Sequence, residues 1–239
     1  MQGLNLTSRQ SISFSVSYII AVQWSSEAMK KLDFQRELTR RQLEFPQTHT
    51  GANDFTLARA VPSALVVKSA SLGPNVSSIS VTSERPVHSL ELFAKEAETV
   101  YDAYRQTLLQ QQCQILKCTA VVRHLYSCSD HAFKYLWEDR LSQDPKDFQR
   151  LGARPVLGGG LRLVMPPMKD DAEPVQIEIK VESYFREANK MFIETLFVWP
   201  KPRLLTLDEK FDPQFRLGNV EEYAVTRVCD FAMPVQTED

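Results

Sequence analysis

The clearest hydrophobic pattern in the chain lies between Val175 and Trp199. Apolar residues alternate with charged or amide residues from Val175 to Phe185, which is the two-residue period of a half-buried β-strand. Met191 to Trp199 is rich in aromatic and β-branched residues, and the short polar segment 187–190 between the two runs is able to turn. The pattern predicts a β-hairpin.

The turn of this hairpin determines which side chains share a face. A loop centred on Ala188 and Asn189 puts Val181 opposite Leu196 on a dry face. The second face then mixes charged residues with three aromatic residues, Tyr184, Phe197 and Trp199. There are two alternatives for such a face. A helix or the rest of the fold covers it, or it contacts another protein or a second copy of the chain. A register shifted by one residue would exchange the two faces.

The first half of the chain, residues 1–127, alternates strand and helix patterns. We expect a strand at 12–23, a helix at 25–44 capped by Ser25 or Ser26, strands at 55–60, 64–70 and 76–82, a helix at 89–111, and a strand at 114–126. Pro62 separates the runs 55–60 and 64–70, which we take as one interrupted strand. The order is then β-α-β-β-α-β, that of ferredoxin-like domains, although no residue motif accompanies it.

The second half, residues 128–239, is built on the 175–199 hairpin. We expect a helix from Ser129 or Asp130 to Leu141 with a short extension to Leu151, a strand at 161–165, an irregular stretch at 204–217 and a short helix at 220–228. The whole pattern predicts an α+β fold with antiparallel sheet and helices packed on one face. We expect the two halves to pack as one unit.

Composition removes several classes of function. The chain has 239 residues, of which 43% are hydrophobic and 24% charged, and a net charge of −2, so no strong field attracts nucleic acid or an anionic membrane. No apolar run approaches the ~18–20 residues of a membrane-spanning helix. The four cysteines do not form a secreted disulfide pattern, which favours a reducing compartment. We therefore expect a cytoplasmic protein without a cofactor that binds neither nucleic acid nor membrane.

One group of residues has the side chains that metals prefer. It consists of Cys118, His124, Cys128 and His131, in the spacing C-x5-H-x3-C-x2-H. This spacing is not that of a recognised zinc finger. Cysteines in the core and a histidine at the start of a helix explain the same residues, so we expect no metal here.

A second group has the chemistry of an anion site. Arg150, Arg154 and Arg162 flank the glycine run 158–160, where backbone amides can approach an anion that the guanidinium groups hold. The alternative is a flexible turn among solvated arginines, because the run lacks a phosphate-loop fingerprint. His49, in a polar loop, and His124 are the residues that could carry a proton in such a site.

These observations leave open whether the chain is an enzyme. There is no G-x-S-x-G elbow and no cysteine in an activating context. The aromatic face of Tyr184, Phe197 and Trp199 favours a non-enzymatic binding module that contacts a protein partner or forms a homo-oligomer. The alternative is an enzyme that acts on a small anionic metabolite through the Arg-rich 158–160 turn.

Overall fold

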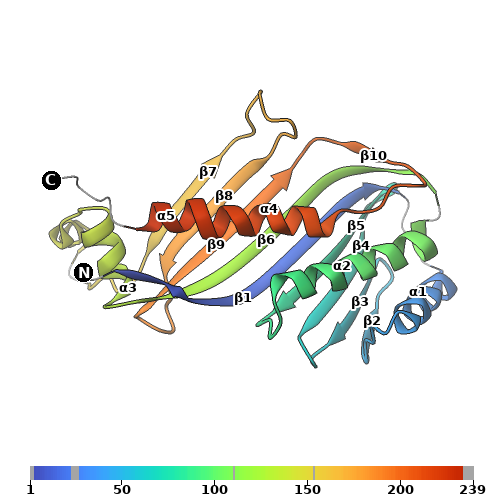
Figure 1. Cartoon of the computed structure of the whole chain (residues 1–239), viewed down its shortest axis with the longest axis horizontal. Coiled ribbons are helices and arrows are strands. Elements are labelled where there is room, and N and C mark those ends of the chain that lie inside the picture. The colour runs from blue at the N-terminus through green and yellow to red at the C-terminus, as the bar shows by residue number, and fades with distance from the viewer. Residues whose placement is uncertain (1–2, 23–26, 110, 153, 234–239) are drawn as a thin grey trace.

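Antiparallel strands form one continuous sheet in the computed structural model, which describes residues 3–22, 27–109, 111–152 and 154–233 (Figure 1). The strands are β1 (Leu4–Ala21), β2 (Gln47–Thr50), β3 (Asp54–Arg59), β4 (Leu65–Gly73), β5 (Val76–Glu84), β6 (Cys113–Cys128), β7 (Gly160–Met165), β8 (Gln176–Ser183), β9 (Lys190–Trp199) and β10 (Arg203–Leu205). Their order is β2-β3-β4-β5-β1-β6-β9-β8-β7, and β10 also pairs with β6. The edges of the sheet are therefore β2 and β7.

Helices cover one face of this sheet, which confirms the α+β class (Figure 1). They are α1 (Ala28–Arg40), α2 (Leu90–Tyr104) with its extension η1 (Arg105–Leu109), and α4 (Pro213–Tyr223), continued by η4 (Ala224–Val228) and α5 (Cys229–Ala232). The shorter turns α3 (Ala132–Lys134), η2 (Tyr135–Arg140) and η3 (Pro145–Leu151) gather near the end of the sheet where β1 begins and α5 ends. In the part of the chain that is described, no helix has the length and apolar character needed to cross a membrane.

The ferredoxin-like element order is not confirmed. Four strands, rather than two, lie between α1 and α2. Residues 47–50 form the edge strand β2 where a polar loop was predicted, and the runs on either side of Pro62 are separate neighbouring strands, β3 and β4. The predicted helix caps Ser25 and Ser26 lie outside the described residues.

The hairpin between β8 and β9 is confirmed, but its predicted register is wrong. Val181 lies opposite Ile193 instead of Leu196, a shift of three positions. Because side chains alternate between faces, an odd shift moves the aromatic residues of β9 to the other side of the sheet. Phe197 and Trp199 are consequently only 6% and 4% exposed and belong to the helix-covered core.

The core lies between the sheet and α2 and α4. Phe14, Val16, Tyr18 and Ile20 occupy every second position of β1, so all four large side chains point toward the helices. The ring of Tyr18 meets those of Tyr101 and Phe211 at centroid distances of 4.9 and 4.7 Å. The Tyr101 hydroxyl donates a 2.8 Å hydrogen bond to the carbonyl of Val16, which ties α2 to the central strand.

A row of polar and charged side chains crosses the opposite face of the sheet. The register aligns one residue from each of β1, β6, β9, β8 and β7, namely Ser13, Arg123, Glu194, Lys180 and Arg162. Glu194 accepts hydrogen bonds of 2.5 Å from both Arg123 and Lys180 and is only 5% exposed. Burial alone raises the pKa of this carboxyl, but the two cations outweigh that effect and lower it.

The C-terminal helix is longer than its sequence pattern indicated. It begins at Pro213, inside the stretch predicted to be irregular, and continues without a break through η4 into α5. Proline suits the first turn of a helix because its missing N–H would have no partner there. Arg216, at the end of the first turn, stacks 4.5 Å above the ring of Trp199, so this unpredicted start of α4 covers β9.

Candidate functional site

The predicted anion-binding residues do not converge. His49 lies on β2 and Arg162 on β7, the two opposite edges of the sheet. Arg162 is already held by Glu178, with hydrogen bonds of 2.7 and 2.9 Å. Arg150 lies in η3, and Arg154 follows it at the rim of a cavity. These four residues therefore do not form one pocket.

The glycine run 158–160 serves close packing. A Cβ at Gly160 would overlap the backbone of Val181 and Glu182, and one at Gly159 would lie 3.1 Å from the ring of Phe133. Only glycine lets the chain enter β7 this close to β8 and to that ring. The space next to the backbone of the run is therefore filled by neighbouring protein atoms.

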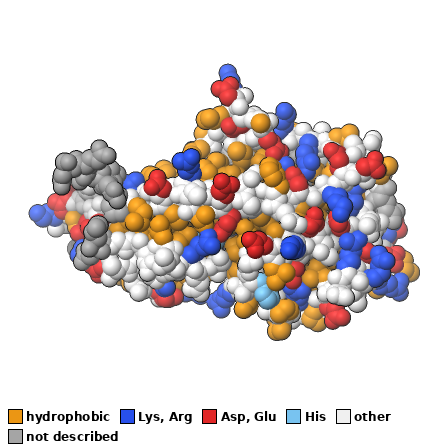
Figure 2. All heavy atoms as spheres, viewed as in Figure 1, with side chains coloured by type: hydrophobic (Ala, Val, Ile, Leu, Met, Phe, Trp, Pro, Cys, Tyr) orange, Lys and Arg blue, Asp and Glu red, His pale blue; other side chains and the backbone are white. Residues whose placement is uncertain are grey.

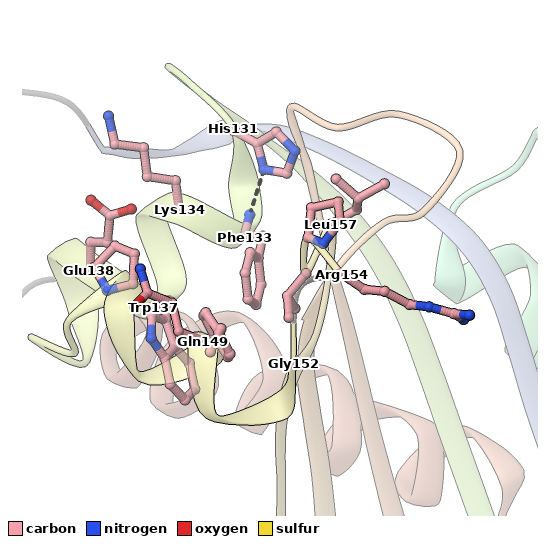
Figure 3. A pocket seen from close by; sticks show the side chains of 13 residues that line it. His131, Phe133, Lys134, Trp137, Glu138, Gln149, Gly152, Arg154 and Leu157 are labelled. Atoms are coloured by element: carbon pink, nitrogen blue, oxygen red, sulfur yellow. Dashed lines mark hydrogen bonds between the residues drawn. The ribbon is translucent and has the colours of Figure 1, made fainter.

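The cavity beside this run is lined by aromatic rings. Phe133, Trp137 and Phe148 lie together, with centroid distances of 6.2 Å (Phe133 to Trp137), 5.5 Å (Phe133 to Phe148) and 4.6 Å (Trp137 to Phe148). The cavity has a volume of about 570 Å³. In Figure 3 the side chains of Lys134 and Arg154 point away from the rings, so the interior is mainly apolar. We call it the aromatic pocket.

Local sequence explains how the pocket forms. His131 begins the helical turn by accepting a 3.3 Å hydrogen bond from the N–H of Phe133 through Nδ1. Phe133 and Trp137 are four residues apart, so they share one side of the turn, while Leu136 enters the core. Asp144 begins η3 by accepting a 2.8 Å hydrogen bond from the N–H of Lys146, which brings Phe148 back onto the two rings.

One polar atom of the pocket lacks a partner. The indole Nε1 of Trp137 is buried and has no hydrogen-bond acceptor among the described residues. A buried donor without an acceptor costs free energy, typically about 1–3 kcal/mol.

The predicted metal-ligand residues are separated. His131 caps the turn beside the aromatic pocket, whereas both ring nitrogens of His124 are hydrogen-bonded within the core. Cys118 and Cys128 are ten positions apart on β6 and are buried. Within the described ranges, no group of three or more His, Cys, Asp or Glu side chains has an arrangement able to hold a metal ion.

The thiols should be unreactive in the folded protein. Burial raises the pKa of Cys118 to about 12 and that of Cys128 to about 11, so neither forms a thiolate near neutral pH. We expect iodoacetamide at about pH 8 to leave all four buried cysteines unmodified in native protein and to alkylate all four in guanidinium, as counted by intact mass. Rapid alkylation of Cys118 in the native protein would contradict its position in the core.

A second polar arrangement, which the sequence pattern did not reveal, surrounds His124. Its Nε2 lies 2.8 Å from a carboxylate oxygen of Glu221 on α4, and its Nδ1 lies 3.2 Å from the hydroxyl of Ser11 on β1. Glu221 is also held by Arg9 at 2.7 Å. The sequence indicates that His124 could carry a proton, but Ser11 and Glu221 are far from it in the chain and carry no motif.

No protein-family model matches the sequence, and no curated protein matches it significantly. The fold and the pocket define an α+β protein with an aromatic cavity beside a free sheet edge, and its function has to be argued from those features.

Proposed function

We propose that the chain is a cytoplasmic interaction module that binds an extended, acidic segment of a protein partner along β7. One apolar side chain of that segment would enter the aromatic pocket. The observation that carries the proposal is the position of this pocket at the start of an exposed edge strand. The four cysteines, all free thiols, favour a reducing compartment.

The edge of β7 can accept another strand. Among the described residues, 161–165 form no backbone hydrogen bonds beyond the ladder with β8. Leu163 and Val164 are 37% and 53% exposed. An exposed apolar edge with free N–H and C=O groups is a template for strand addition, and natural proteins usually protect such edges unless a partner covers them.

The aromatic pocket provides an anchor next to that edge. Gly159 immediately precedes β7 and packs on Phe133, so a strand paired with β7 would run past the pocket opening. Leu151 and Leu157 near the pocket are 76% and 68% exposed, which extends the apolar surface. A buried apolar side chain in such a pocket supplies much of the binding free energy of an interface.

Charge favours an acidic partner over a second copy of the chain. Segment 145–165 contains four cations (Lys146, Arg150, Arg154 and Arg162) and one anion (Asp147), a net charge of 4 − 1 = +3. Arg162 is paired with Glu178, whereas Arg150 and Arg154 form no ion pair within the described ranges. Two copies of β7 side by side would bring like charges together, but an acidic segment would be attracted.

A designed peptide tests this proposal. The probe is a fluorescein-labelled peptide in which glutamate alternates with valine on either side of one phenylalanine. We expect saturable binding by fluorescence anisotropy, weakened about tenfold or more by Arg150→Glu with Arg154→Glu, by Trp137→Ala and by Phe148→Ala. The affinity should also fall as salt is added.

Matched controls distinguish binding at this site from non-specific binding of the peptide. Arg227→Glu changes an exposed arginine on η4, and Phe185→Ala removes a ring that is 92% exposed, so both should leave the affinity unchanged. A peptide with lysine in place of glutamate should not bind. Equal binding of both peptides, or equal losses in the control variants, would contradict the proposal, and concentration-dependent self-association without peptide binding would favour a homo-oligomer.

A further inference from the structure

We propose that Ser11 is a nucleophile and that the chain hydrolyses esters of acids that carry an additional negative charge. His124 would act as the general base, with Glu221 as its positioning residue. The proposal rests on the groups around His124 and on the cavity next to them, and it is independent of partner binding at β7.

The contacts of His124 match the arrangement of an activated serine. The carboxylate of Glu221 can only accept a hydrogen bond, so the 2.8 Å contact places the ring proton on Nε2. Nδ1 of the neutral ring is then free to accept the hydroxyl proton of Ser11, 3.2 Å away. A nucleophile, a base in reach of it and a third group that orients the base form the triad of serine hydrolases, which is recognised by geometry on unrelated folds.

The base is buried, but the nucleophile is not. His124 is fully buried, and its ring lies 6.2 Å from the rings of both Phe14 and Tyr126, which hold it between β1 and the helix layer. Ser11 is partly exposed and borders a cavity of about 630 Å³. The hydroxyl group of Ser11 is thus within reach of a substrate in this cavity.

The backbone around Ser11 departs from a regular strand. The pairing of β1 with β6 shifts register on both sides of this residue, between Asn5 and Gln10 and again between Ser11 and Ser13. Such bulges re-aim side chains and are frequent next to active sites. Arg85, held at a φ of 49°, donates its N–H to the carbonyl of Ile12 at 2.8 Å and so fixes the cavity wall beside Ser11.

The cavity favours a negatively charged substrate. Arg85 and Arg186 line it and form no ion pair among the described residues, against one lining carboxylate, Glu187. Tyr184 also lines it, so the residue predicted for a contact surface belongs to this wall. Positive charge in a cavity attracts an anionic substrate and stabilises the oxyanion of the tetrahedral intermediate.

The reaction balances without a cofactor. The Ser11 oxygen attacks the ester carbonyl while its proton passes to Nδ1 of His124, and the bond to the leaving alcohol breaks as the alcohol takes that proton. Water then attacks the acyl-serine, again giving a proton to His124, which returns it to Ser11 as the acid leaves. The sum is ester plus water to acid plus alcohol.

Two probes test the proposal on the full chain. Phenylmethanesulfonyl fluoride should modify Ser11, as located by peptide mass spectrometry. 4-Nitrophenyl hemisuccinate should be hydrolysed about 100-fold or more faster by the wild-type protein than by Ser11→Ala, because the variant lacks the nucleophile that His124 activates as general base, and such activation contributes about that factor. Glu221→Gln should lower kcat with little change in KM. Arg85→Gln with Arg186→Gln should reduce kcat/KM about tenfold more for the hemisuccinate than for 4-nitrophenyl acetate, which carries no additional charge.

Controls separate catalysis from a structural role of His124. Ser15→Ala removes a neighbouring β1 hydroxyl that bonds Thr82, and it should keep full activity. If His124 serves only to fill the core, Glu221→Gln would lower the denaturation midpoint while esterase activity stayed at background in every protein. No labelling of Ser11 in folded wild-type protein, or equal hydrolysis by Ser11→Ala, would overturn the proposal.

Discussion

Replacing Arg216 with alanine should lower the free energy of unfolding by about 3–5 kcal/mol. The side chain is 3% exposed and donates hydrogen bonds to Asp212 at 3.0 Å and to Glu173 at 2.5 Å. Asp212 keeps hydrogen bonds from Arg203 and from the hydroxyl of Tyr18, but Glu173 loses the cation that it pairs with, and Trp199 loses the guanidinium stacked on its ring. Urea denaturation followed by circular dichroism measures the change.

An exposed ion pair supplies the control for this variant. Arg36 pairs with Asp33 on α1 at 3.3 Å, with side chains that are 66% and 51% exposed. Arg36→Ala should change stability by less than about 1 kcal/mol because water screens such pairs. A similarly small effect for Arg216→Ala would mean that the start of α4 does not pack on β9.

Trp199→Ala should also destabilise the protein by about 3–5 kcal/mol. Its ring packs 5.7 Å from that of Phe197 and lies beneath the guanidinium of Arg216, so truncation leaves a cavity under α4. Phe185→Ala, at an aromatic residue that is 92% exposed, should have almost no effect. Guanidinium denaturation of the three proteins gives the comparison.

The same variant decides where the aromatic residues of β9 lie. If Trp199 were on an exposed contact surface, its removal would alter self-association and leave stability unchanged. Sedimentation velocity alongside denaturation separates these outcomes. Unchanged stability of Trp199→Ala would contradict the burial of this residue and would support the register with Val181 opposite Leu196.

Sequence patterns identified this hairpin but not its register, for a physical reason. In β8 the alternation of apolar and polar residues is clear, so the strand and its inward face follow directly. In β9 apolar residues occupy both parities, with Phe192, Leu196 and Val198 on one face and Ile193 and Phe197 on the other. Neither face is distinguished by polarity, and only the turn geometry sets the pairing.

The aromatic pocket was only partly visible in the sequence. Phe133 and Trp137, four residues apart in a predicted helix, share one side of it, and this spacing was the available signal. Phe148 joins them only because the chain turns at Pro145. Such tertiary contacts produce no periodic pattern in the sequence.

The group of Ser11, His124 and Glu221 is still harder to predict from sequence, because its members come from β1, β6 and α4.

The distribution of surface charge bears on where an acidic partner would bind. Acidic and basic side chains are interspersed over the helix-covered side, without a large area of one sign (Figure 2). The net +3 charge of segment 145–165 therefore stands out against a chain with a net charge of −2. We expect an acidic partner to be drawn to this end of the sheet rather than to the helix layer.

Hydrogen exchange of β7 with the acidic peptide bound tests the central claim most directly. Those backbone amides of residues 161–165 that face away from β8 should exchange rapidly in the free protein and slowly in the complex, while the amides of β2 at the opposite edge stay unchanged. Peptide binding without added protection in β7, or with protection at β2 instead, would contradict strand addition at this edge.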